Sequence, residues 1–348
     1  MMSEKLKNMK NFYEFFPYPG RPFFLKPIVF NHLNIHLGYQ RNLVRCGEGG
    51  LSQDTQTSFE SKKKIEDQKS SLLKKSHESL QDLVCDSENI ALVGSGTDEP
   101  LLFRKLHPNN RIYSFDLSQR SLMRARIKVF LDSFIKNILF LPLFRFKNIF
   151  IQGDASLKLL EYKSHFSYIQ CFGVLHHQPR PEVLFKSITD SLSADGILRL
   201  MIYSYHGRRL ERRIQRKYGS IWSKKNKVMR FFLLMKAFFS IYLWRILKIF
   251  SSDKSLKARF QYLGLFPKPI ADAFLHPSDA GLALETLKAL IKDNGYELIS
   301  FEVHIYERGH LCKFHKEAKT LFEEAILEDK KGNLLSNPIF VLQKKALF

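Results

Sequence analysis

A pair of glycines and an aspartate are spaced as a ribose-containing ligand requires. Gly94 and Gly96 follow a short apolar run, residues 90–93, and precede residues that favour a helix. Glycine in such a turn lets the backbone bend sharply and brings its N–H groups close to a ligand. Asp116 ends a second apolar run 22 residues after Gly94, where a carboxylate can accept hydrogen bonds from both ribose hydroxyls. The pattern predicts a buried strand, a glycine turn and a helix that bind a nucleotide-like ligand.

Two further apolar runs are followed by polar groups. Asp154 comes after residues 148–152, and a loop with His176 and His177 comes after residues 166–172. Parallel strands present their carboxyl ends at one edge of an α/β sheet, and ligands bind at that edge. Histidine, whose pKa lies near neutral pH, can act there as a general base. The four runs together therefore predict one site at the edge of a sheet.

The residues after the first turn bear on the kind of ligand. A dinucleotide-binding turn has a third glycine three residues after the second, and Glu99 stands at that position. Asp98 and Glu99 would also compete with a pyrophosphate for the start of the helix. A ligand without phosphates, with an amino-acid end and an adenosine end, suits this turn better. S-adenosylmethionine is such a ligand.

Several of these segments resemble motifs of the class I S-adenosylmethionine-dependent methyltransferases, bacterial members with a type 11/12-like domain above all. The similar segments lie between residues 86 and 204 and are residues 92–97, 113–118, 152–155, 173–177 and 192–204. The resemblance implies that the cofactor contacts Val93, Gly94, Ser95, Gly96, Thr97, Asp116, Leu117, Asp154, Ala155, Gly173 and Val174. In this interpretation the backbone at Gly94 and Gly96 lies along the methionine part of the cofactor, Asp116 binds the ribose and Asp154 binds the adenine amine. His176 or His177 is the candidate catalytic base, and no metal is expected.

The chain departs from the family pattern at two positions. The family usually has an acid two residues before the first glycine, where this chain has Leu92. It also has a third glycine where this chain has Asp98. Both changes affect the methionine end of the site, so they bear on the affinity for the cofactor.

The resemblance also implies the fold class. We expect an α/β fold with a Rossmann-like sheet of seven strands, mostly parallel with the last strand antiparallel, flanked by helices. Residues 83–206 and 267–348 are expected to form the two parts of this core, and residues 207–266 a basic and hydrophobic helical cap inserted between them. Residues 1–50 would form an aromatic, proline-rich arm or lid, and residues 51–82 a polar linker with a leading helix.

Prolines at 17, 19 and 22 favour an extended conformation for the N-terminal arm. In the cap, residues 228–250 approach the length of a membrane span. Four basic residues interrupt this stretch, namely Arg230, Lys236, Arg245 and Lys248. We expect a helix that is mostly buried over the active site, with attachment to anionic lipid as the alternative. The resemblance also makes Asp272 and His276 candidates for the substrate side.

The composition extends these expectations. The 348 residues include 55 Lys and Arg against 34 Asp and Glu, a net charge of +21 that attracts nucleic acid or an anionic membrane surface. Four widely spaced cysteines indicate free thiols in a reducing compartment, and the first residues lack a signal peptide, so we expect a cytoplasmic location.

The methyl acceptor stays open between a small molecule, a protein and RNA. A nicotinamide-dependent oxidoreductase and a non-catalytic protein that binds nucleic acid or membrane are the alternatives.

Overall fold

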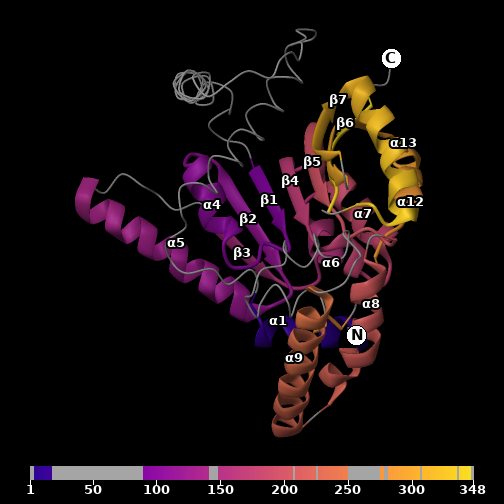
Figure 1. Cartoon of the computed structure of the whole chain (residues 1–348). Coiled ribbons are helices and arrows are strands. Elements are labelled where there is room, and N and C mark those ends of the chain that lie inside the picture. The colour runs from indigo at the N-terminus through magenta and orange to yellow at the C-terminus, as the bar shows by residue number, and fades with distance from the viewer. Residues whose placement is uncertain are drawn as a thin grey trace, which may run out of the picture.

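The strands that the structure describes form one sheet, seen in the computed structural model (Figure 1). The structure describes residues 4–17, 89–140, 148–206, 208–224, 226–249, 275–277, 281–305, 308–334 and 337–345. Within these ranges the strands are β1 (Asn89–Val93), β2 (Arg111–Asp116), β3 (Asn148–Gln152), β4 (Phe166–Phe172), β5 (Leu192–Met201), β6 (Tyr296–Ile305), β7 (Gly309–Phe314) and β8 (Ile339–Lys344). Their order across the sheet is β3-β2-β1-β4-β5-β8-β6-β7.

The first five strands, β1 to β5, are parallel to one another. The last strand of the chain, β8, lies between β5 and β6 and is antiparallel to both. The predicted α/β fold with an antiparallel last strand is therefore confirmed. The first five positions follow the order of a doubly wound sheet, in which ligands bind where the order reverses, here between β1 and β4.

The sheet has one strand more than the seven expected. β7 pairs with β6 in antiparallel register at the edge of the sheet. Its sequence, Gly-His-Leu-Cys-Lys-Phe, contains no β-branched residue, so local propensity gives no strand signal. The pairing with β6 and the packing of helix α13 (His315–Lys331) form this strand.

Helices cover both faces of the sheet. On one face, α6 (Ala155–Lys158), α7 (Pro181–Ser191), α12 (Leu284–Asp293) and α13 enclose the largest apolar core. On the other face α4 (Glu99–Leu106) packs Phe103 against Ile90, Leu92 and Ile112. α5 (Gln119–Phe140) lies beside α4 and contacts β2 and β3. The central strands are thus buried on both faces, as parallel sheets require.

A second apolar core lies beyond the carboxyl ends of the strands, where Figure 1 shows α1 (Glu4–Phe15), α8 (Arg209–Tyr218) and α9 (Lys227–Ile249). Phe12 of α1 is buried there against Trp222, Leu234 and Leu275. The prediction of an extended arm is wrong for residues 4–15, which form the helix α1. The helix ends two residues before Pro17, because a proline disfavours the helical conformation of the residue that precedes it. Residues 18–50 of the arm and the linker 51–82 lie outside the described residues.

The prediction of a mostly buried helix at 228–250 is wrong for the side chains that the structure describes. Leu234, Ala237 and Ile241 of α9 are buried, whereas the opposite side exposes large apolar side chains such as Phe232 and Phe239. The spacing of apolar residues could not predict which side of α9 is buried, because the helix is apolar on both sides. Among the described residues, no helix has both the length and the apolar character that crossing a bilayer requires.

The packing of α1 predicts the effect of a substitution. Phe12→Ala removes a side chain that is 1 % exposed, and we expect it to lower the free energy of unfolding by about 3–5 kcal/mol in urea titrations. Phe15→Ala on the same helix removes a side chain that is 45 % exposed, and should cost less than about 1 kcal/mol. Equal losses from the two variants would contradict the placement of α1.

Candidate active site

A cavity of about 580 Å³ opens at the carboxyl ends of the first five strands. Its volume is within the range of small-molecule sites, about 300–1,000 Å³. Ten of the residues predicted from the sequence line it, namely Gly94, Ser95, Gly96, Asp116, Leu117, Asp154, Ala155, Gly173, Val174 and His177. Val93, Thr97 and His176 do not line it. The structure therefore brings most of the predicted residues together, and their roles toward a cofactor stay a prediction.

Hydrogen bonds hold the glycine turn against the neighbouring strand. The backbone N–H groups of Gly94 and Ser95 donate to the carbonyl oxygen of Phe115, at 2.8 and 3.1 Å. The N–H of Gly96 donates to Oδ2 of Asp116 at 2.8 Å. The turn and the carboxylate are thus parts of one rigid arrangement.

Steric crowding explains the glycine at position 94. Its φ is +71°, in the left-handed region that side chains disfavour. A Cβ atom there would lie only 2.1 Å from Cγ2 of Val174, in the loop after β4. The loops after β1 and β4 can therefore approach each other only because position 94 has no side chain.

Asp116 lines the cavity, and each of its two carboxylate oxygens already accepts one hydrogen bond from the backbone. Its Oδ1 accepts from the N–H of Ser118 at 2.7 Å, and its Oδ2 accepts from Gly96. Burial raises the pKa of this carboxyl to about 6, although the two N–H bonds act in the opposite direction. Each carboxylate oxygen has a second lone pair, so Asp116 can still accept from ligand hydroxyls.

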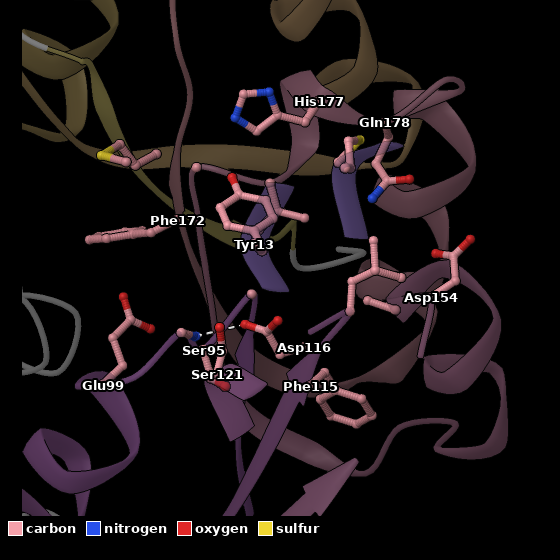
Figure 2. A pocket seen from close by; sticks show the side chains of 18 of the residues that line it. Tyr13, Ser95, Glu99, Phe115, Asp116, Ser121, Asp154, Phe172, His177 and Gln178 are labelled. Atoms are coloured by element: carbon pink, nitrogen blue, oxygen red, sulfur yellow. Dashed lines mark hydrogen bonds between the residues drawn. The ribbon is translucent and has the colours of Figure 1, made fainter. Parts of the chain in front are cut away.

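Asp154 is held as the N-cap of α6. Its Oδ1 accepts from the N–H of Ser156 at 3.0 Å and from the hydroxyl of Ser156 at 2.8 Å. A cap of this kind fixes the side chain at the start of the helix. Figure 2 shows Asp154 and Glu99 at opposite ends of the cavity, with Asp116 between them.

Glu99 is a site residue that the sequence analysis did not select. Burial raises the pKa of its carboxyl to about 8, with smaller opposing effects from the hydrogen bond to Gln170 and the charge of Arg199. Its Oε2 is buried and has no partner among the described residues, and the same holds for the hydroxyl of Ser95. Two orphaned polar atoms in one cavity indicate a polar ligand.

The interpretation of Asp98 and Glu99 as two equal carboxylates also needs correction. Asp98 forms a buried ion pair with Lys128 of α5, so its charge is compensated. Glu99 instead lies by Gln170, which is the neighbour of Leu92 in the register of β1 and β4. Glu99 therefore places a carboxylate beside the position where the family usually has its acid. An acid in the first turn of the helix after a glycine turn is the signal that could have identified it.

The two histidines of the loop after β4 differ in their surroundings. The N–H of Tyr203 donates to Nδ1 of His176 at 3.0 Å, and the Nε2 atoms of His176 and His177 are 3.1 Å apart. Burial, with the nearby His177 ring, keeps the pKa of His176 well below its usual value, so its ring is neutral. Nδ1 of His176 is then an acceptor, and its Nε2–H donates to His177. Both ring nitrogens of His176 are thus engaged within the protein, whereas His177 lines the cavity.

The substrate-side candidates are only partly described. His276 is buried and stacks on His177 with ring centroids 3.9 Å apart, but it does not line the cavity. Asp272 lies outside the described residues. His276 therefore supports the wall of the cavity that His177 forms.

The N-terminal helix supplies another wall. Leu6, Met9 and Tyr13 of α1 line the cavity. Arg120 at the start of α5 donates to the carbonyl oxygen of Glu14 at 2.7 Å, which holds α1 in place. The arm or lid expected from the sequence named none of these three residues, although their spacing of three and four positions is that of one helix face.

Comparisons with known proteins add the following findings. No protein-family model and no curated protein matches the sequence. PKMT2 from Rickettsia typhi, solved with AdoHcy, shares 14 % identity, with 76 % of this chain and 50 % of that chain covered and a TM-score of 0.49. A SAM-dependent methyltransferase from Methanosarcina mazei shares 12 %, covering 77 % and 97 %, with a TM-score of 0.40. The chain spans about half the length of the Rickettsia protein. The strand order and the antiparallel last strand themselves show an α/β fold whose parallel part is doubly wound.

A matched pair of glycine variants tests the contact between the two loops. Gly94 and Gly295 share a φ of +71°, but a Cβ at Gly295 meets no atom within 4 Å. We expect Gly295→Ala to cost about 1–2 kcal/mol through backbone strain alone. Gly94→Ala should cost clearly more and abolish any ligand-induced stabilisation, as measured by thermal unfolding. Equal losses would show that the approach of Val174 does not constrain the turn.

Proposed function

We propose that the chain is an S-adenosylmethionine-dependent methyltransferase. The observation that supports this most directly is the order of three carboxylates in one cavity: Glu99, Asp116 and Asp154. S-adenosylmethionine has three groups of hydrogen-bond donors in the same order, namely its ammonium, its ribose hydroxyls and its adenine amine. Each carboxylate would then accept from one of them.

The residues present fit this cofactor. The unpartnered Oε2 of Glu99 suits the cationic ammonium group, since a charged partner restores the free energy lost on burial of the carboxylate. Asp116 would bind the ribose and Asp154 the adenine amine. The glycine turn lets the backbone approach the methionine part, and Gly173 and Val174 line the pocket where the strand order reverses.

When bound, S-adenosylmethionine supplies a methyl group on a sulfonium centre, which a nucleophile attacks. The residues of the chain would hold donor and acceptor in line and exclude water. We assign the acceptor side to the wall that contains His177, Gln178 and Tyr203. If a base is needed, His177 is the candidate, because it lines the cavity and His176 does not. The acceptor stays open between a small molecule, a protein side chain and RNA.

A nicotinamide dinucleotide fits less well. Its pyrophosphate would lie at the N-terminus of α4, where Glu99 already places a carboxylate. No feature of the described residues favours this alternative.

Ligand-induced stabilisation tests the proposal. S-adenosylhomocysteine at about 100 times its Kd should add about 2.7 kcal/mol to the free energy of unfolding, and NADH should add nothing. Asp116→Asn should weaken the binding of S-adenosylhomocysteine by about tenfold or more in isothermal titration calorimetry, because the hydrogen bonds to a charged acceptor are lost. Asp190→Asn, at an exposed carboxylate that pairs with Lys186, is the control and should bind as the wild type does. Absence of binding by the wild type would overturn the proposal.

The pH dependence of binding tests the role of Glu99. The pKa of Glu99 is about 8 and that of Asp116 about 6, and the ligand needs both groups ionised. Affinity for S-adenosylhomocysteine should therefore rise with pH through 6 and again through 8, because binding releases protons below these values. In Glu99→Gln the rise near 8 should disappear. Glu161→Gln, at an exposed surface carboxylate, should keep the wild-type profile.

The same pKa shift affects the unliganded protein, which provides a second readout. The pKa of Glu99 is raised from 4.5, so the wild type should lose stability as the pH rises from 4.5 through 8. Glu99→Gln should lose less over this interval. An unchanged pH profile in both assays would contradict the assignment of Glu99.

A further inference from the structure

Helix α9 presents an apolar surface to solvent. This surface, which we call the α9 surface, consists of Val228, Met229, Phe231, Phe232, Met235, Phe239 and Leu243, all exposed. The opposite side of the helix packs Leu234, Ala237 and Ile241 into the core that contains Phe12. The helix is therefore apolar on two opposite sides, and the described residues cover one of them.

The exposed side chains form a continuous stripe. Val228, Phe232, Met235 and Phe239 follow one another at steps of four, three and four residues, so they lie on one face of the helix. Phe232 is 66 % exposed and Phe239 is 71 % exposed. Single exposed apolar residues are common, but a stripe of this length indicates a binding surface.

The stretch of sequence that contains this surface is strongly basic. Residues 212–252 contain eleven Lys and Arg and no Asp or Glu. In α8, which precedes α9 in the chain, Arg209, Arg213, Arg216 and Lys217 are exposed, and Lys236 is exposed on α9 itself. An apolar helix face with basic residues around it is the pattern of helices that lie in the interface of an anionic membrane.

We propose that the α9 surface docks on the anionic surface of a lipid membrane. The apolar stripe would enter the boundary between headgroups and acyl chains, and the basic residues would contact the headgroups. A second copy of the chain is disfavoured because it would bring two acid-free basic segments together. RNA would neutralise the basic residues but would leave the aliphatic part of the stripe in water.

Helix α1 connects α9 to the cavity, because it lines the cavity and its C-terminal end lies against α9. Leu6, Met9 and Tyr13 of α1 line the cavity. Phe16, just after the helix, contacts Phe238 of α9 with ring centroids 6.1 Å apart. Figure 1 shows α1 and α9 on the same side of the sheet, beyond the strand ends. Helix α1 therefore lies against the buried side of α9 and lines the cavity as well.

Vesicle sedimentation with the full chain tests this inference. We expect the protein to sediment with vesicles of phosphatidylcholine and phosphatidylglycerol, less with phosphatidylcholine alone, and less at high salt. The double variant Phe232→Ser/Phe239→Ser should bind the anionic vesicles at least about tenfold more weakly, since two exposed phenyl groups no longer enter the membrane. Both side chains are exposed, so the fold and the melting temperature should be retained.

A matched double variant separates the α9 surface from general hydrophobic adsorption. Phe130 and Phe134 of α5 are 63 % and 51 % exposed, so Phe130→Ser/Phe134→Ser removes similar side chains elsewhere and should leave vesicle binding unchanged. Equal losses in the two double variants would overturn the inference. It would also be overturned by binding to polyuridylate without binding to vesicles, or by a dimer that the α9 variant dissociates in sedimentation velocity while vesicles do not bind. Absence of binding to any of these partners would overturn it as well.

Discussion

The bond from the Gly96 N–H to the Asp116 carboxylate is the interaction on which the rest of the site depends. It joins the turn after β1 to the end of β2 at 2.8 Å, and two further bonds join the same turn to Phe115. Val174 from the loop after β4 closes on Gly94 from the other side. Contacts within the chain thereby hold three strand ends around one cavity. Preorganisation of this kind lowers the cost of binding a small molecule.

The three carboxyl groups along the cavity differ in their electrostatic surroundings. Glu99 at one end has a strongly raised pKa, Asp116 in the middle a moderately raised one, and Asp154 at the other end caps a helix. The neighbouring Asp98 is compensated by Lys128. The cavity is therefore one that favours hydrogen-bond donors along its length and a cation near Glu99. A phosphate-bearing ligand would meet a carboxylate where it needs free N–H groups.

The glycine turn, the strand ends and the fold class could be predicted from the sequence, because each depends on residues that are close together in the chain. Gly94, Asp116 and Asp154 line one cavity as the spacing indicated. What could not be predicted depends on distant contacts. The helix α1 lines the cavity from more than 70 positions before the turn, and β7 forms only through its pairing with β6. The buried surroundings of His176 likewise depend on Tyr203, in the segment after β5. For α9, the apolar composition was visible, but which side is covered depends on Phe12 and Trp222.

The most direct test of the central claim is hydrogen–deuterium exchange of the full chain with and without S-adenosylhomocysteine. We expect slower exchange of backbone amides in residues 94–97, 116–118, 153–156 and 173–175, which lie around the cavity, and unchanged exchange in the edge strand β7. Bound ligand with no protection at 116–118 and 153–156, or with protection confined to the helices beyond the strand ends, would contradict it.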